Sequence, residues 1–184
     1  MSDPKSKHSA KSGAKPDARQ AAASRRAARQ RASARLAAVQ ALYQLAMGDS
    51  TPDQVIREFV EVRLKEEVDG VRLAEADKRL LSELVRGVAA QSDELDDMLA
   101  AVLDEDWPVE RLETLLLVLL RAGTYELAER RTVPIRVVIS EYMAVADAFF
   151  SGKEPAMVNG VLDRVAGALR PEERAPEAAP VEPA

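Results

Sequence analysis

The sequence predicts an all-α protein of about seven helices. Apolar residues recur at intervals of three and four along most of the chain, the spacing of one helix face. Nowhere do four to eight β-branched or aromatic residues alternate with polar ones between turn signals, the pattern of a strand. Away from the two ends there are four prolines, and each fits the first position of a helix, where a missing N–H costs nothing. These prolines are Pro52, Pro108, Pro134 and Pro155.

The first four helices are predicted from periodicity and capping signals. An apolar stripe of Leu36, Val39, Tyr43 and Ala46 marks the first helix, which is expected to stop at Gly48. Residues 51–54 (TPDQ) form a capping-box signature that opens the second helix. The third helix is expected to start near Asp77, and Ser92 is expected to cap the fourth.

The last three helices are each expected to open at a proline. The fifth, from Trp107-Pro108, is apolar around most of its circumference, which places it at the centre of a bundle. Trp107 itself is expected to fill the core. Pro134 and Pro155 open the sixth and seventh helices, whose apolar rows face inward.

Charge is distributed unevenly along the chain. Residues 1–35 carry a net charge of +8, whereas the remainder carries −13. Residues 1–28 are therefore expected to be a disordered basic arm, 29–170 a helical domain, and 171–184 a disordered tail rich in Pro and Glu.

Composition excludes several classes of function. The chain has no cysteine, which excludes disulfides, thiol catalysis and Cys-ligated metals and fits a reducing cytoplasm. Its single histidine, His8, lies in the arm, so no His-based triad or metal site is expected in the body. No segment is apolar for long enough to span a membrane or to act as a secretory signal. Carboxylate pairs such as Glu126 with Glu129, or Glu141 with Asp147, are interpreted as solvated helix faces and not as catalytic groups. We expect no enzymatic activity, metal or cofactor.

The join between the arm and the first helix favours a nucleic-acid ligand. On an ideal helix, Arg25 and Arg29 would lie over the apolar stripe, so the packed part is expected to begin near residues 30–32. Arg25, Arg26 and Arg29 would then project from a frayed or flexible segment, while Arg31 and Arg35 flank the stripe. Arginines of this kind suit phosphate contacts, although a solubilising tail is the alternative.

Several motifs, in order, resemble the NusB family of bacterial transcription antitermination factors. The motifs are residues 31–43 (RASARLAAVQALY), 119–127 (LLRAGTYEL), Val133-Pro134, 138–141 (VISE) and 158–163 (VNGVLD). The resemblance covers roughly residues 29–170. It implies two small helical bundles that bind boxA RNA in nascent ribosomal RNA transcripts, together with ribosomal protein NusE, in an RNA polymerase antitermination complex.

The resemblance also implies roles for individual residues. It implies RNA-binding roles for the arginines of the first helix, for two motif residues beyond them and for the loop before the last helix. These residues are Arg29, Arg31, Arg35, Gln40, Tyr43, Phe149, Lys153 and Met157, with Arg25 and Arg26 added from the arm. Tyr43 and Phe149 have core packing as their alternative role. Leu116 and Arg121 are expected on the side that binds NusE.

Two other functions remain open at this stage. A NusB-like domain also begins certain ribosomal RNA cytosine methyltransferases, which would require an additional α/β domain. Alternatively, the apolar central helix would drive homodimerisation of a protein adaptor.

Overall fold

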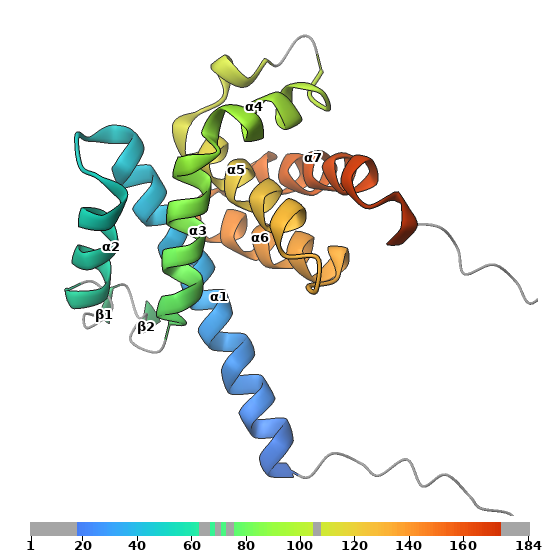
Figure 1. Ribbon diagram of the computed structural model, residues 1–184. Helices are drawn as coiled ribbons and strands as arrows, with labels where there is room; N and C mark the ends of the chain where they lie inside the picture. Colours follow the sequence, from blue (N-terminus) through green and yellow to red (C-terminus); the bar gives the residue numbers. More distant parts are fainter. Residues whose placement is uncertain (1–17, 63–66, 69–70, 73–75, 105–107, 174–184) are drawn as a thin grey trace, which may run out of the picture.

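The computed structural model describes residues 18–62, 67–68, 71–72, 76–104 and 108–173 (Figure 1). Within these ranges the chain forms seven α-helices, two 3₁₀ helices and a hairpin of two-residue strands. The α-helices are α1 (Ala18–Met47), α2 (Pro52–Glu61), α3 (Lys78–Ala90), α4 (Ser92–Ala100), α5 (Thr114–Glu129), α6 (Ile135–Phe149) and α7 (Glu154–Leu169). The shorter elements are β1 (Glu67–Val68), β2 (Val71–Arg72), η3 (Val109–Arg111) and η4 (Pro171–Glu173). The predicted all-α class is confirmed, with the small antiparallel hairpin as the one addition that the sequence did not suggest.

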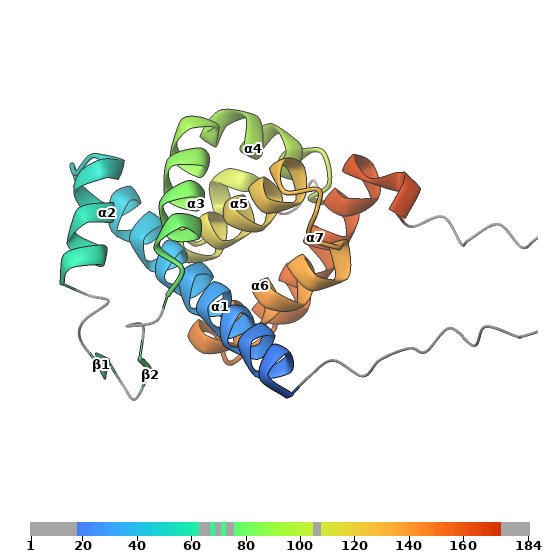
Figure 2. The same cartoon turned by 60° about the horizontal axis from the view of Figure 1, so that its bottom comes forward.

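The helices pack around α5, as the sequence predicts for its most apolar segment. α5 contacts α1, α3, α4, α6 and α7, and it lies inside the molecule in the views of Figures 1 and 2. α1, α2 and α3 form one group, and α4 to α7 form the other, with the α1–α5, α3–α5 and α1–α6 contacts joining them. None of the described helices is both long and apolar enough to cross a membrane.

Most predicted helix starts are confirmed, with small shifts. The capping box at Thr51 is present, since its hydroxyl accepts from the Gln54 N–H and the Gln54 amide oxygen accepts from the Thr51 N–H. Asp77 caps α3 through the N–H groups of Arg79 and Leu80. Ser92 is the first residue of α4 and not its cap.

The prolines differ more from their predicted positions. Pro52 is the first residue of its helix, Pro134 is an N-cap and Pro155 is the second residue of α7. Pro108 opens only η3, and the fifth α-helix begins at Thr114 because the backbone at Leu112 is extended. Trp107 lies outside the described residues.

The buried face of α1 is built mainly from alanine. Four alanines are fully buried on it, and small side chains let neighbouring helices approach closely. They are Ala34, Ala37, Ala38 and Ala41. The predicted stripe of large apolar residues is therefore wrong in phase: Val39 is buried, but Tyr43 and Ala46 are exposed.

Two close contacts of glycine hold helices of the core together. A Cβ added at Gly123 would lie 2.8 Å from one methyl carbon of the buried Leu162. α5 and α7 can therefore pack closely at this point because Gly123 has no side chain. A Cβ at Gly87 would similarly meet the ring of Tyr125. Both glycines are needed for close approach.

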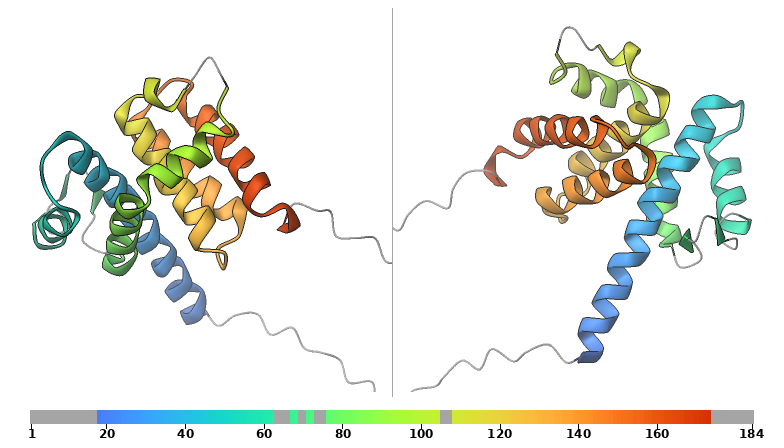
Figure 3. Two further views of the ribbon diagram at one scale, coloured as in Figure 1. Left: turned by 45° about the horizontal axis from the view of Figure 1, so that its top comes forward. Right: turned by 180° about the vertical axis from the view of Figure 1, so that it is seen from behind.

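The N-terminal end of α1 differs from the expected disordered arm. α1 begins at Ala18, so residues 18–28 are helical, and this end projects away from the other helices (Figure 3, right). Arginines on this side of α1 are not forced into the core, because none of the other described helices lies over this end. Residues 1–17 lie outside the described part of the chain.

The C-terminal segment is also more structured than expected at its start. Residues 171–173 form η4, and the preceding Arg170 is buried. The Arg170 Nε–H donates to the Leu127 carbonyl at 2.7 Å, and its Nη1 donates to the Val133 carbonyl at 2.8 Å. These bonds satisfy carbonyl groups at and after the end of α5. The expected disorder of 174–184 concerns residues outside the described ranges.

Candidate nucleic-acid interface

Arg35, expected to face RNA, lies in the core. Its side chain is 2% exposed and binds Glu126 of α5 through two hydrogen bonds, Nε to Oε2 at 2.9 Å and Nη2 to Oε1 at 2.5 Å. Its Nη1 donates to Glu141 of α6 at 2.8 Å. With three donors occupied, Arg35 is not available to phosphate in this structure. The helical-wheel argument failed because it placed the buried face around the large apolar residues and not around the alanines.

The Arg35 ion pair belongs to a larger network whose outer members, Arg130 and Glu83, are partly exposed. The Arg130 guanidinium lies 3.6 Å from Glu126 and also binds Glu83 of α3 at 2.9 Å. Burial opposes the charge of Arg35, but the hydrogen bond and the charge of Glu126 outweigh it, so the pKa of Arg35 is raised. The network thus joins α1, α3, α5 and α6 through ion pairs between two arginines and three glutamates.

Tyr142 lies fully buried beside this network. Burial, followed by the nearby charge of Glu126, raises the pKa of Tyr142 well above its ordinary value. Its hydroxyl has no hydrogen-bond partner among the described residues. Tyr142 therefore stays neutral at any physiological pH.

The structure corrects the interpretation of Glu126 as a solvated carboxylate. Glu126 is fully buried and Glu141 partly so, and both are bound to Arg35. Carboxylates held by a guanidinium in this way are structural charges and not a free acid–base pair. No cluster suited to a metal ion occurs in the described part of the chain.

A stripe of exposed and half-buried residues runs along α1. It consists of Arg25, Arg29, Leu36, Gln40, Tyr43 and Met47, which follow one another at spacings of three, four and seven residues and so share one side of the helix. Tyr43 is 38% exposed and Met47 is 63% exposed, Arg25 and Arg29 are also exposed, and Leu36 and Gln40 are half-buried. The stripe therefore presents cations at one end and an aromatic ring at the other.

The loop before α7 adjoins this stripe through α6. A pocket of about 230 Å³ is lined by Ala32 and Leu36 from α1 and by Ala144 and Ala148 from α6. Phe149, the residue after Ala148, packs partly against the core. Lys153 is exposed at the start of α7, and Met157 is half-buried one turn later. The pocket thus connects the end of α6, where Phe149 lies, with the stripe.

Arg31 occupies a different edge of α1. It lines a pocket of about 330 Å³ together with Ala28, Thr132, Pro134 and Val137. Arg31 is exposed, but six residues separate it from Arg25, which turns its side chain away from the stripe. The predicted arginines therefore divide into the stripe, the Arg31 edge and the buried Arg35.

The two residues expected to face NusE differ in accessibility. Leu116 is 4% exposed and packs in the core, so it is not a surface contact. Arg121 is half-buried and binds Asp96 of α4 through two bonds of 2.7 and 2.6 Å. It also lines a pocket of about 200 Å³ with residues of α1 and α3, among them Leu45 and Val88.

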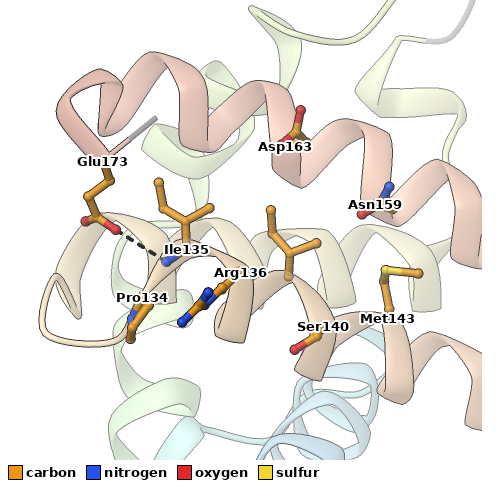
Figure 4. Close-up of a pocket in the computed structure, with 9 residues that line it drawn as sticks. Pro134, Ile135, Arg136, Ser140, Met143, Asn159, Asp163 and Glu173 are labelled. Atoms are coloured by element: carbon orange, nitrogen blue, oxygen red, sulfur yellow. Dashed lines mark hydrogen bonds between the residues drawn. The ribbon is translucent and has the colours of Figure 1, made fainter. Parts of the chain in front are cut away.

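A groove between α6 and α7 was not anticipated from the sequence (Figure 4). It has a volume of about 540 Å³, and Ile135, Ile139 and Met143 line it along α6. Asn159 and Asp163 approach from α7, and the Glu173 carboxylate accepts from the Ile135 N–H at 3.4 Å. Of its three apolar lining residues on α6, Ile139 was expected to face inward, and no role was predicted for Ile135 or Met143.

Comparison with known proteins shows one consistent similarity. A model of the NusB family matches residues 32–167. Three proteins named transcription antitermination protein NusB align with most of the chain. The protein of Sinorhizobium fredii is 43% identical over 139 residues, which are 76% of this chain and 87% of its own. That of Agrobacterium fabrum is 43% identical over 137 residues, 74% of this chain and 83% of its own. That of Brucella suis is 44% identical over 139 residues, 76% of this chain and 81% of its own.

The fold is likewise similar to a solved structure. T. maritima NusB superposes with a TM-score of 0.62 at 28% sequence identity, covering 77% of this chain and 94% of that one.

Proposed function

The chain belongs to the NusB family, and we propose that it is an RNA-binding transcription antitermination factor. Its ligand is boxA-type single-stranded RNA in nascent ribosomal RNA transcripts, bound together with ribosomal protein NusE in the RNA polymerase antitermination complex. It acts in the cytoplasm as a binding protein and not as an enzyme.

The single observation that carries this proposal is the exposed stripe of α1. Arginines at its N-terminal end supply charge for phosphates, and Gln40 and Tyr43 supply an amide and a ring for bases. Stacking on an exposed aromatic ring is the usual way to hold an unpaired base. The stripe therefore fits a single strand laid along the helix.

The other proposed RNA contacts extend from both sides of this stripe. Arg26 and Arg31 add positive charge on neighbouring edges of α1. Phe149 ends α6 and follows Ala148, which lines the small pocket beside Leu36, and Lys153 and Met157 lie at the start of α7. The acidic remainder of the chain would repel duplex phosphates, so a narrow single-stranded path is favoured.

NusE is assigned to the surface around Arg121. This arginine is held by Asp96 yet remains partly accessible, and it borders the shallow pocket between α1, α3 and α5. Leu116 supports this surface from the core side of α5 and does not touch the partner. An ordered arginine at the rim of an apolar hollow suits a protein contact.

The proposal is tested by titrating boxA-type and scrambled RNAs with the chain, each with and without NusE. We expect boxA RNA to bind more tightly, NusE to increase the difference, and the affinity to fall with salt by a slope of about −0.7 per phosphate. Equal affinity for both RNAs in both settings would contradict the proposal. Light scattering over the same concentrations shows whether the alternative, a homodimeric adaptor, applies.

A further inference from the structure

The N-terminal end of α1 lies outside the residues that the family model matches. The family match begins at residue 32, whereas α1 begins at Ala18. The fourteen residues between them carry five arginines and no acidic residue. At 1.5 Å per residue this segment is about 21 Å long, and it projects clear of the other helices in Figures 1 and 3.

This segment is helical for local reasons. Six of its residues are alanine, the strongest helix former, and the segment continues a helix that the core has already nucleated. At its base the Asp77 N–H donates to the Gln30 carbonyl at 3.0 Å, so the projecting part begins next to a fixed point. The arginines are therefore carried on a rod with a defined direction.

The phase of this rod matches the exposed stripe. Arg25 and Arg29 are separated by four residues, and Leu36 follows Arg29 after seven. Both spacings bring side chains back to the same side of a helix. The two guanidiniums thus extend the line of Leu36, Gln40 and Tyr43 beyond the end of the bundle, about 6 Å apart along the axis.

We infer that residues 18–31 are a second, rigid RNA-contact segment that binds the phosphates flanking the RNA held by the family core. This inference rests on the proposed function and adds a longer footprint to it. A length of 21 Å corresponds to about six nucleotides at roughly 3.4 Å per stacked nucleotide. Arg25 and Arg29 bind successive flanking phosphates, and the remaining arginines of the segment strengthen the local positive potential.

The test compares a boxA-type RNA with RNAs extended by about six nucleotides at the 5′ or the 3′ end. We expect one extended RNA to bind the full chain more tightly than the short one. Replacing both Arg25→Gln and Arg29→Gln should reduce that gain to none and lower the salt slope by about 1.4, two phosphates at 0.7 each. The matched control, Arg57→Gln with Arg111→Gln, removes the same charge from exposed positions outside α1 and should leave the gain unchanged.

A second variant separates geometry from charge. Insertion of two alanines between Arg29 and Gln30 turns the projecting segment by about 200° around the helix axis and leaves the net charge of the chain unchanged. We expect this variant to bind the extended RNA no more tightly than the short one, so that the gain is lost. Circular dichroism checks that the helix persists.

The outcomes distinguish this inference from the proposed function. If the short RNA binds but neither extension binds more tightly, the second contact segment is disproved while the core function stands. If the insertion variant or the Arg57/Arg111 control behaves opposite to expectation, the segment is only a generic basic tail. If neither length binds the full chain, the proposed function itself fails.

Discussion

Arg35 and Glu126 meet face to face inside the protein, joined by two hydrogen bonds across 91 residues of sequence. The pair fastens α1, which carries the proposed RNA stripe, to the central α5. Glu141 adds a third bond to the same guanidinium from α6. The direction of α1 relative to the bundle is therefore set by buried charge as well as by the packing of alanines.

The first prediction concerns removal of this cation. Arg35→Met leaves Glu126 without its principal counter-charge in a buried site, which should cost about 3–5 kcal/mol of the free energy of unfolding. Adding Glu126→Leu removes the stranded carboxylate and should restore most of the loss. Urea denaturation of the single and double variants measures both.

The control for this prediction is the Arg121–Asp96 pair. It has the same two-bond geometry but is partly exposed, so Arg121→Met should cost about 1 kcal/mol or less. A cost for Arg35→Met no greater than for Arg121→Met would show that burial of the first pair has no energetic consequence.

The second prediction concerns alkaline pH. The pKa of Tyr142 is raised in the native protein by burial and then by Glu126, whereas an unfolded tyrosine ionises near pH 10. Above about pH 10 the unfolded chain therefore releases a proton that the native protein retains, so stability falls as pH rises, by up to about 1.4 kcal/mol per unit. Tyr142→Phe should lack this part of the decline, so its stability relative to the wild type should stay constant below pH 9 and rise above pH 10. The prediction is refuted if the difference in free energy of unfolding between the variant and the wild type is the same below pH 9 and above pH 10.

The third prediction concerns Gly123. In Gly123→Ala the new methyl group meets the fully buried Leu162, and overpacking should outweigh the gain in helix propensity, with a net loss of about 1–2 kcal/mol. The loss should shrink in a Leu162→Val background. Gly160→Ala is the comparison, because nothing lies within 4 Å of that position and about 0.5–1 kcal/mol should be gained. Thermal unfolding of both variants and of the wild type measures the expected loss for Gly123→Ala and the expected gain for Gly160→Ala.

The fourth prediction separates binding from stability at Tyr43. Because this ring is exposed, Tyr43→Ala should change the free energy of unfolding by about 0.5 kcal/mol or less. Loss of a stacked base should weaken boxA RNA binding by about 1–3 kcal/mol, and Tyr43→Phe should retain the affinity. A variant that unfolds more easily yet binds RNA normally would assign Tyr43 to the core.

Much of the fold was predictable because local signals agreed with the final packing. Thr51 with Gln54, Asp77 and the apolar rows of α6 and α7 each act within one or two helical turns, and the structure confirms them. The phase of α1 was not predictable in the same way. Which face of α1 is buried depends on how closely α3 and α5 approach it, and the positions of the alanines in the sequence do not predict that distance.

In the candidate site, too, local features were predictable from the sequence and long-range contacts were not. The charge asymmetry and the motifs pointed to α1, but the sequence could not show that Arg35 meets Glu126 and Glu141, because both partners lie on distant helices. Arg25 and Arg29 were expected on a flexible segment because the place where the bundle ends is a tertiary property. Once α1 is known to continue to Ala18, their alignment with Tyr43 follows from spacing alone.

The long separation of Arg35 from its partners also bears on how the protein is made. Glu126 and Glu141 are added to the growing chain 91 and 106 residues after Arg35. At roughly 5–20 residues per second, the ribosome needs about 5–20 seconds to supply them. During that interval Arg35 lacks both of its native counter-charges. The ion pairs that join α1 to α5 and α6 are thus completed late in synthesis, although α1 is the first helix made.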